Sequence, residues 1–69
     1  GLPMTFEEAN KAMKEKCPVY YMGNWYDIIY CKESTNGDTV MIKRRSLNNR
    51  YDPVEIEPLY LTLKEVGHV

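Results

Sequence analysis

Residues 18–32 read PVYYMGNWYDIIYCK, and this stretch decides the kind of fold that the chain adopts. It is rich in aromatic and β-branched residues, which are typical of strands. The pair Gly23-Asn24 interrupts it in the manner of a tight hairpin turn. The stretch therefore predicts two antiparallel strands, at about 18–22 and 25–33.

A two-residue turn also predicts the register of this hairpin, because it pairs Met22 with Trp25. Side chains alternate between the two faces of a strand, so one face collects the residues that we expect in the core. These residues are Val19, Tyr21, Tyr26, Ile28 and Tyr30. The opposite face mixes polar and apolar residues.

Upstream of the hairpin, residues 5–16 carry the signals of a helix. Thr5 and Glu8 form a capping-box pattern, in which each side chain bonds the backbone N–H of the other residue. Pro18 disfavours helix in the residue before it. Apolar residues recur at helical spacing and predict one buried stripe, formed by Phe6, Ala9 and Met13. A helix this short needs a packing partner, which the sheet supplies.

Downstream, residues 34–38 read STNGD and predict a second turn. We expect the turn to be centred on Thr35-Asn36, with Gly37 in the left-handed region as part of a bulge. This register pairs the first residue of the segment with the last, and it directs Val40 and Ile42 towards the core. A slip of one residue would expose both of them.

The predicted fold is α+β and mostly β: one domain over residues 1–69, in which a helix precedes a curled antiparallel sheet of four or five strands. The strands are expected at about 18–22, 25–33, 39–44, 54–57 and 59–63, with a loose tail at 64–69. In the last two strands, the expected core residues are Val54, Ile56, Leu59, Leu61 and Leu63. The strand spacing favours a small SH3-like barrel with the helix at one open end.

Composition excludes several classes of function. Nine Lys and Arg against ten Asp and Glu give a net charge of −1, so no overall field attracts nucleic acid or anionic lipid. No apolar run is long enough for a membrane span. The single histidine, His68, lies in the tail, which leaves no catalytic triad and no metal site, and no glycine-rich loop predicts a bound cofactor. We therefore expect a protein that is not an enzyme.

The two cysteines, Cys17 and Cys31, are too few for the disulfide framework of a secreted mini-domain. The predicted register of the first hairpin places them on opposite faces, so free thiols are expected. A reducing, cytoplasmic setting follows from this cysteine usage.

The remaining candidates are binding surfaces. The leading hypothesis is a small interaction module that binds a protein or peptide through exposed aromatic residues with basic residues at the rim. These candidates are Tyr20, Tyr51, Tyr60, Arg44 and Arg45. The simpler alternative is that such aromatic residues form a second small core.

A different hypothesis is a nucleic-acid-binding accessory protein that grips phosphates with a basic strand end and loop. Its candidate residues are Lys43, Arg44, Arg45 and Arg50. The simpler alternative is a solvated strand end. A third hypothesis is a structural homo-oligomer that forms when exposed strand edges pair.

The segments TFEEA at 5–9, VYYMG at 19–23 and WYDII at 25–29 together resemble small uncharacterised proteins of bacterial phages and mobile elements. In those proteins a short helix leads into a curled β-meander, and the later segments 40–42 and 54–63 fit the same layout. The resemblance implies a bacterial or prophage cytoplasmic protein without known catalysis. It carries no site residues over to this chain.

Overall fold

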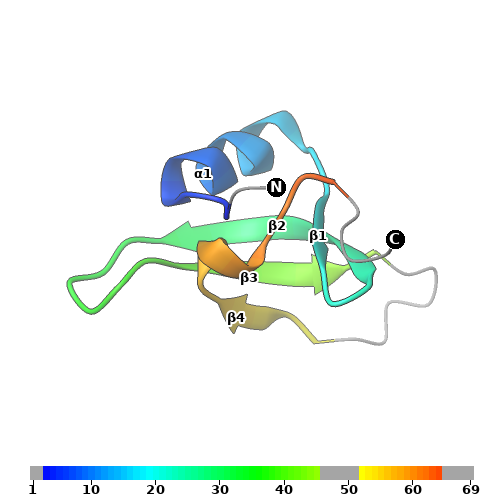
Figure 1. Cartoon of the computed structure of the whole chain (residues 1–69). Coiled ribbons are helices and arrows are strands. Elements are labelled where there is room, and N and C mark those ends of the chain that lie inside the picture. The colour runs from blue at the N-terminus through cyan, green and yellow to red at the C-terminus, as the bar shows by residue number, and fades with distance from the viewer. Residues whose placement is uncertain (1–2, 46–51, 65–69) are drawn as a thin grey trace.

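The computed structural model describes residues 3–45 and 52–64 of the chain. One helix and a four-stranded antiparallel sheet make up a mostly β, α+β fold, as the sequence predicts, and the sheet is not closed. The strands follow one another in the order β1-β2-β3-β4, with α1 lying over one face (Figure 1). The elements are α1 (Phe6–Glu15), β1 (Val19–Tyr21), β2 (Asn24–Lys32), β3 (Thr39–Arg44), β4 (Val54–Ile56) and the 3₁₀ helix η1 (Pro58–Tyr60).

Helix α1 begins where the capping box predicts. The Glu8 N–H donates to Thr5 Oγ1 at 3.1 Å, and the Thr5 N–H donates to Glu8 Oε1 at 2.9 Å. The helix ends at Lys16, whose φ of 58° is left-handed and whose N–H bonds back into the last turn. Its buried residues are Ala9 and Ala12, whereas Phe6 and Met13 of the predicted stripe are half-buried, with Met13 packed against the core.

The first hairpin turns one residue earlier than predicted. Met22 and Gly23 both have positive φ, 48° and 82°, as a type I′ turn requires. Tyr20 therefore pairs with Trp25 and Tyr21 pairs with Asn24. Asn24 stabilises this turn, because its Nδ2 donates to the Met22 carbonyl at 3.3 Å. The predicted residue pairs of this hairpin are wrong. The observed register differs from the predicted one by two positions, however, and a shift by an even number leaves each side chain of the hairpin on its predicted face.

In the second hairpin the turn lies where it was predicted, but the pairing of residues between the two strands differs from the prediction. The Gly37 N–H donates to the Ser34 carbonyl at 3.1 Å, which places the turn on Thr35-Asn36 as expected, and Gly37 has a φ of 123°. The ladder, however, begins only at Lys32 and Thr39. Asp38 is not paired in the ladder, because its Oδ1 accepts the Ser34 N–H instead.

A bulge lies in the middle of β2 rather than at the turn. Ile28 pairs with Ile42, and Tyr30 pairs with Met41, so Ile29 is the extra residue. Beyond the bulge the two faces exchange, and Tyr30 is 58% exposed while Cys31 packs against the core. The predicted burial of Tyr30 is therefore wrong.

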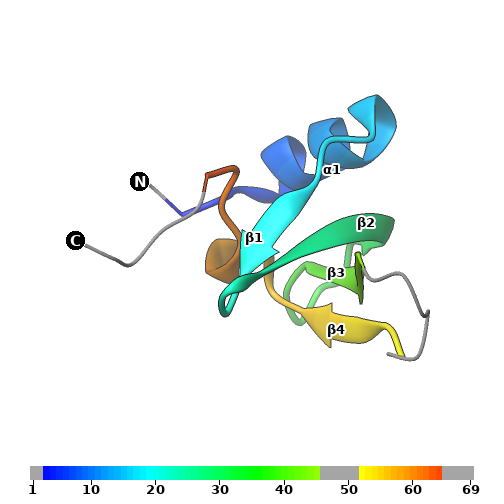
Figure 2. The same ribbon diagram turned by 90° about the vertical axis from the view of Figure 1, so that its right-hand side faces the viewer.

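The expected strand at 59–63 is also absent. Pro58 starts η1 instead, where its fixed φ suits the first helical position, and the Leu61 N–H donates to the Pro58 carbonyl at 3.0 Å. The chain then extends and reaches β1. The Tyr20 N–H donates to the Thr62 carbonyl at 2.7 Å, and the Thr62 N–H donates to the Tyr20 carbonyl at 3.2 Å. Figure 2 shows this C-terminal segment passing beside β1.

One apolar cluster joins the inner face of the sheet to α1 and to the segment after η1. Its buried members are Met4, Ala9, Ala12, Val19, Ile28, Val40, Ile42, Ile56 and Leu61. Val40 and Ile42 are buried as predicted. The expected core residues Val54, Leu59 and Leu63 are exposed, because β4 is short and η1 rotates the residues that follow it.

Candidate functional site

Three residues of the predicted basic group, Lys43, Arg44 and Arg45, lie at the end of β3, and both arginines have side-chain partners. Arg45 Nε lies 3.2 Å from Asp27 Oδ1, and Arg44 Nη2 donates to Asn24 Oδ1 at 2.9 Å. Lys43 pairs with Asp27 across the strands. Arg50 lies outside the described residues. The arrangement is that of a hydrogen-bonded strand end with a carboxylate among its cations.

The structure describes two of the three predicted aromatic residues, Tyr20 and Tyr60, and they have different surroundings. Tyr20 is half-buried and packs edge-on against Trp25, with ring centroids 5.1 Å apart at an angle of 68°. Tyr60 is 57% exposed and lies in a different setting, near Tyr21. Tyr51 falls outside the described residues. Among the described residues, Tyr60 lines a surface groove.

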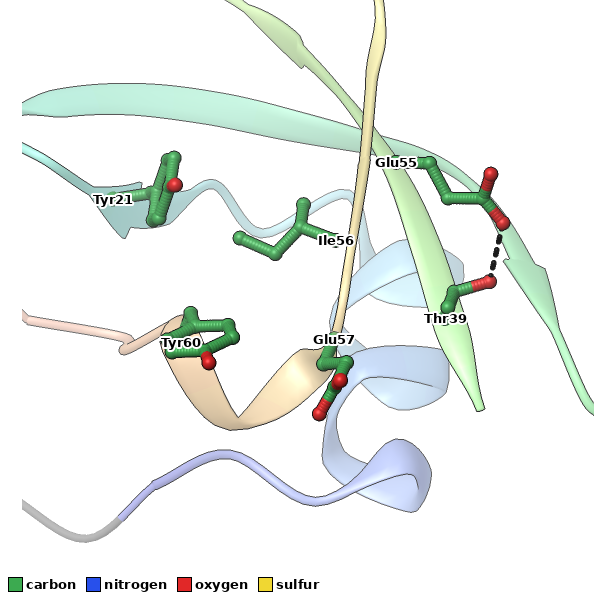
Figure 3. Close-up of a pocket in the computed structure, with 6 residues that line it drawn as sticks. All are labelled: Tyr21, Thr39, Glu55, Ile56, Glu57 and Tyr60. Atoms are coloured by element: carbon green, nitrogen blue, oxygen red, sulfur yellow. Dashed lines mark hydrogen bonds between the residues drawn. The ribbon is translucent and has the colours of Figure 1, made fainter. Parts of the chain in front are cut away.

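This groove, which we call the β4 groove, has a volume of about 450 Å³. It is built from β1, β3, β4, the residue after β4 and η1, so no single segment of sequence encodes it. Its lining residues are Tyr21, Thr39, Glu55, Ile56, Glu57 and Tyr60. Figure 3 shows the two tyrosines on one side of β4, with Glu55 and Thr39 on the other side.

The tyrosine side of the β4 groove is fixed by packing. Tyr21 is the last residue of β1 and packs against Tyr26 with ring centroids 5.9 Å apart. Tyr60 ends η1, whose Pro58 is buried and whose following residue, Leu61, is fully buried. Buried residues therefore anchor the segment that carries Tyr60, while the Tyr60 side chain itself stays open to solvent.

The other side of the β4 groove is acidic. Glu55 Oε2 accepts a hydrogen bond of 2.7 Å from Thr39 Oγ1, which orients the carboxylate (Figure 3). An ionised carboxylate accepts about four hydrogen bonds, so this one leaves capacity for a ligand. Glu57 follows directly after β4. Within residues 3–45 and 52–64, neither glutamate forms an ion pair.

The backbone of β4 forms the floor between these two sides. Strand β4 pairs with β3 along one edge, and in the described part of the chain nothing pairs with its other edge. The backbone N–H and C=O groups that alternate residues of β4 point outward therefore have no strand partner among the described residues.

The described residues also bear on metal binding, thiol reactivity and membrane crossing. They contain no cluster of three or more His, Cys, Asp or Glu side chains that could hold a metal ion. Cys17 and Cys31 are free thiols as predicted, and burial raises the pKa of the Cys31 thiol, which makes it a weaker nucleophile at neutral pH. Of the helices that the structure describes, none has the length and apolar character to cross a membrane.

Sequence analysis identified Tyr60 but missed the rest of the β4 groove. Tyr21 was expected only in the core, and Glu55 was not among the predicted site residues. One signal was available: Pro58 at the boundary of the predicted strands is typical of a sheet edge, where an unpaired backbone is tolerated.

Comparisons with known proteins give no relative. No known protein family matches the chain, and neither a curated protein nor a solved structure matches it. The resemblance to phage and mobile-element proteins, the SH3-like assignment and the cytoplasmic setting therefore stay predictions.

Proposed function

We propose that this domain is a non-catalytic interaction module that binds a peptide segment of a partner protein in the β4 groove. The observation that carries the proposal is Tyr60, which is 57% exposed at the end of η1 and lines a groove beside a sheet edge that no described strand covers. Tyrosine is enriched among the residues that dominate binding energy, because it offers a large contact area at a small entropic cost.

The nucleic-acid hypothesis has weaker support. Arg45 is paired with Asp27, and Arg44 donates to Asn24, so binding phosphate there has to compete with existing interactions. The exposed Tyr60 lines a groove with two glutamates, and carboxylates repel phosphate. These observations favour a peptide over a polyanion.

The test is selection of random linear peptides displayed on phage against the immobilised protein, followed by titration of the selected peptides. We expect them to perturb the backbone amide resonances of Tyr21, Glu55 and Tyr60. The variant Tyr60→Ala should weaken binding by about 30-fold, which corresponds to about 2 kcal/mol for an anchoring residue.

Leu59→Ala is the matched control, because Leu59 precedes Tyr60 in η1, is 48% exposed and does not line the β4 groove. This variant should bind the same peptides within about twofold of the unmodified protein. Selected peptides that bind Tyr60→Ala as tightly as the unmodified protein would overturn the proposal. Binding of random-sequence duplex DNA that weakens steeply with salt, and that is lost in Lys43→Ala, would support the nucleic-acid hypothesis instead.

A further inference from the structure

The two edges of the sheet differ in a way that shows how a peptide can bind. At β1, both backbone groups of Tyr20 are bonded to Thr62, at 2.7 and 3.2 Å. At β4, the described residues leave the outer edge without a partner. An extended peptide can add to an open edge as a further strand, with main-chain hydrogen bonds for affinity and side-chain pockets for specificity.

The β4 groove matches the alternation of such an added strand. Successive side chains of a strand point to opposite faces of the sheet. On one face of β4 a bound peptide would meet Tyr21 and Tyr60, and on the other face it would meet the Glu55 carboxylate (Figure 3). The side chains on the two faces of the peptide would therefore contact different groups of the groove, tyrosine rings on one face and a carboxylate on the other.

The charges on this edge select the chemistry of the peptide. Glu55 and Glu57 are exposed, and in the described part of the chain neither has an ion-pair partner. Thr39 already holds the Glu55 carboxylate in place, which lowers the entropy lost when a cation binds. Lys and Arg also pack their apolar stems and cationic heads against tyrosine rings.

A second copy of this chain fits the same edge poorly. Antiparallel pairing of β4 with itself about its central residue places Glu55 opposite Glu55, and like charges directly opposite are destabilising. Of the two next registers that keep the same faces together, one places Glu55 opposite Glu57 and the other places it opposite Pro53, which has no backbone N–H to donate. The charge pattern thus disfavours self-pairing and favours a cationic partner.

We infer that the ligand of the β4 groove is a basic, extended segment of a partner protein that adds to β4 as a further strand and places Lys or Arg against Glu55 and Glu57. This inference rests on the proposed function and adds to it the binding mode and the charge of the partner. The basic side chain contacts the carboxylates, and the alternate side chains pack on Tyr21 and Tyr60.

The test uses three blocked synthetic peptides that alternate valine with lysine, glutamine or glutamate. We expect the lysine peptide to bind at least about tenfold more tightly than the glutamine peptide at low salt, with the glutamate peptide weakest. The double variant Glu55→Gln/Glu57→Gln should reduce the affinity for the lysine peptide to that for the glutamine peptide. Glu15→Gln, an exposed change on α1 outside the groove, is the matched control.

Strand addition is tested with two N-methylated forms of the lysine peptide, each modified at one of the two alternating sets of residues. Only one set donates to β4, so one form should lose binding and the other should keep it. Equal binding of both forms and the parent would overturn the strand-addition mode.

The failure of this inference differs from the failure of the proposed function. If the glutamine peptide binds as tightly as the lysine peptide and both are weakened by Tyr60→Ala, the basic specificity is wrong and the proposed function holds. If no synthetic peptide perturbs the β4 groove while phage-selected peptides do, the inference alone fails. If the selected peptides ignore Tyr60, the proposed function fails as well.

Discussion

The two edge strands of this sheet have the same length but differ in what pairs with their outer edges. Both β1 and β4 contain three residues, but the segment after η1 covers β1, whereas nothing described covers β4. Strand β4 is instead bounded by Pro53 and Pro58 and carries Glu55. Short length, flanking prolines and charge are recognised ways of keeping an open edge from aggregating. One edge is thus protected by a partner within the chain, and the other has no strand partner within residues 3–45 and 52–64.

The largest expected effect comes from releasing the segment that covers β1. Leu61 is 0% exposed and anchors this segment in the core, whereas Leu63 is 52% exposed. Leu61→Ala should lower the free energy of unfolding by about 2–5 kcal/mol through lost burial and the cavity left behind. Leu63→Ala should change it by less than about 0.5 kcal/mol. Denaturant midpoints of the two variants measure the difference, and equal midpoints would contradict this account of the covered edge.

A smaller effect is expected from breaking the backbone pairing itself. Thr62→Pro removes the N–H that donates to the Tyr20 carbonyl, and Leu61 already has the extended conformation that a residue before proline prefers. The cost should be about 1–3 kcal/mol, with faster hydrogen exchange at the Tyr20 amide. Thr62→Val keeps the N–H and is the control. Unchanged Tyr20 exchange in Thr62→Pro would show that packing alone holds the segment.

Helix α1 contributes to the covered edge indirectly, because it packs on η1. Thr5→Ala removes the acceptor of the Glu8 N–H and should cost about 1 kcal/mol of stability. Peptide affinity at the β4 groove should stay within about twofold, since no residue of α1 lines the groove. A midpoint identical to that of the unmodified protein would show that packing, rather than the cap, fixes the start of the helix.

Local signals predicted the elements of this fold that depend on neighbouring residues. The capping box placed the start of α1, and the glycine of the STNGD segment placed the second turn. Those signals did not predict the features that depend on how one strand pairs with another. The bulge at Ile29 has no distinctive residue, because it results from fitting β2 against β3 while Ile28 and Ile42 stay buried. It reversed the prediction for Tyr30.

In the candidate site, too, some residues could be predicted from local sequence, whereas the position of others depends on long-range packing. Tyr60 could be identified from the sequence, because the predicted strand alternation places this aromatic residue outside the core, and exposed tyrosines are typical anchors of interfaces. Glu55 and Glu57 could be placed on an exposed face, but their closeness to Tyr21 depends on how far the sheet curls and on the turn made by η1. Those are long-range properties of the packed domain, and no short pattern encodes them.

The smallest expected effect on stability, and the sharpest test of the comparison, is at the open edge. Glu55→Val removes the charge that opposes self-pairing and increases β-propensity, while the free energy of unfolding should change by less than about 0.5 kcal/mol because the side chain is exposed. Without like charges facing each other, two copies can join through β4, so sedimentation velocity should show dimers at protein concentrations where the unmodified chain is monomeric. A valine at Lys32, exposed at the end of β2 and away from both edges, is the matched control and should remain monomeric. If Glu55→Val also stays monomeric, then the short length of β4 and its flanking prolines, rather than charge, protect the edge.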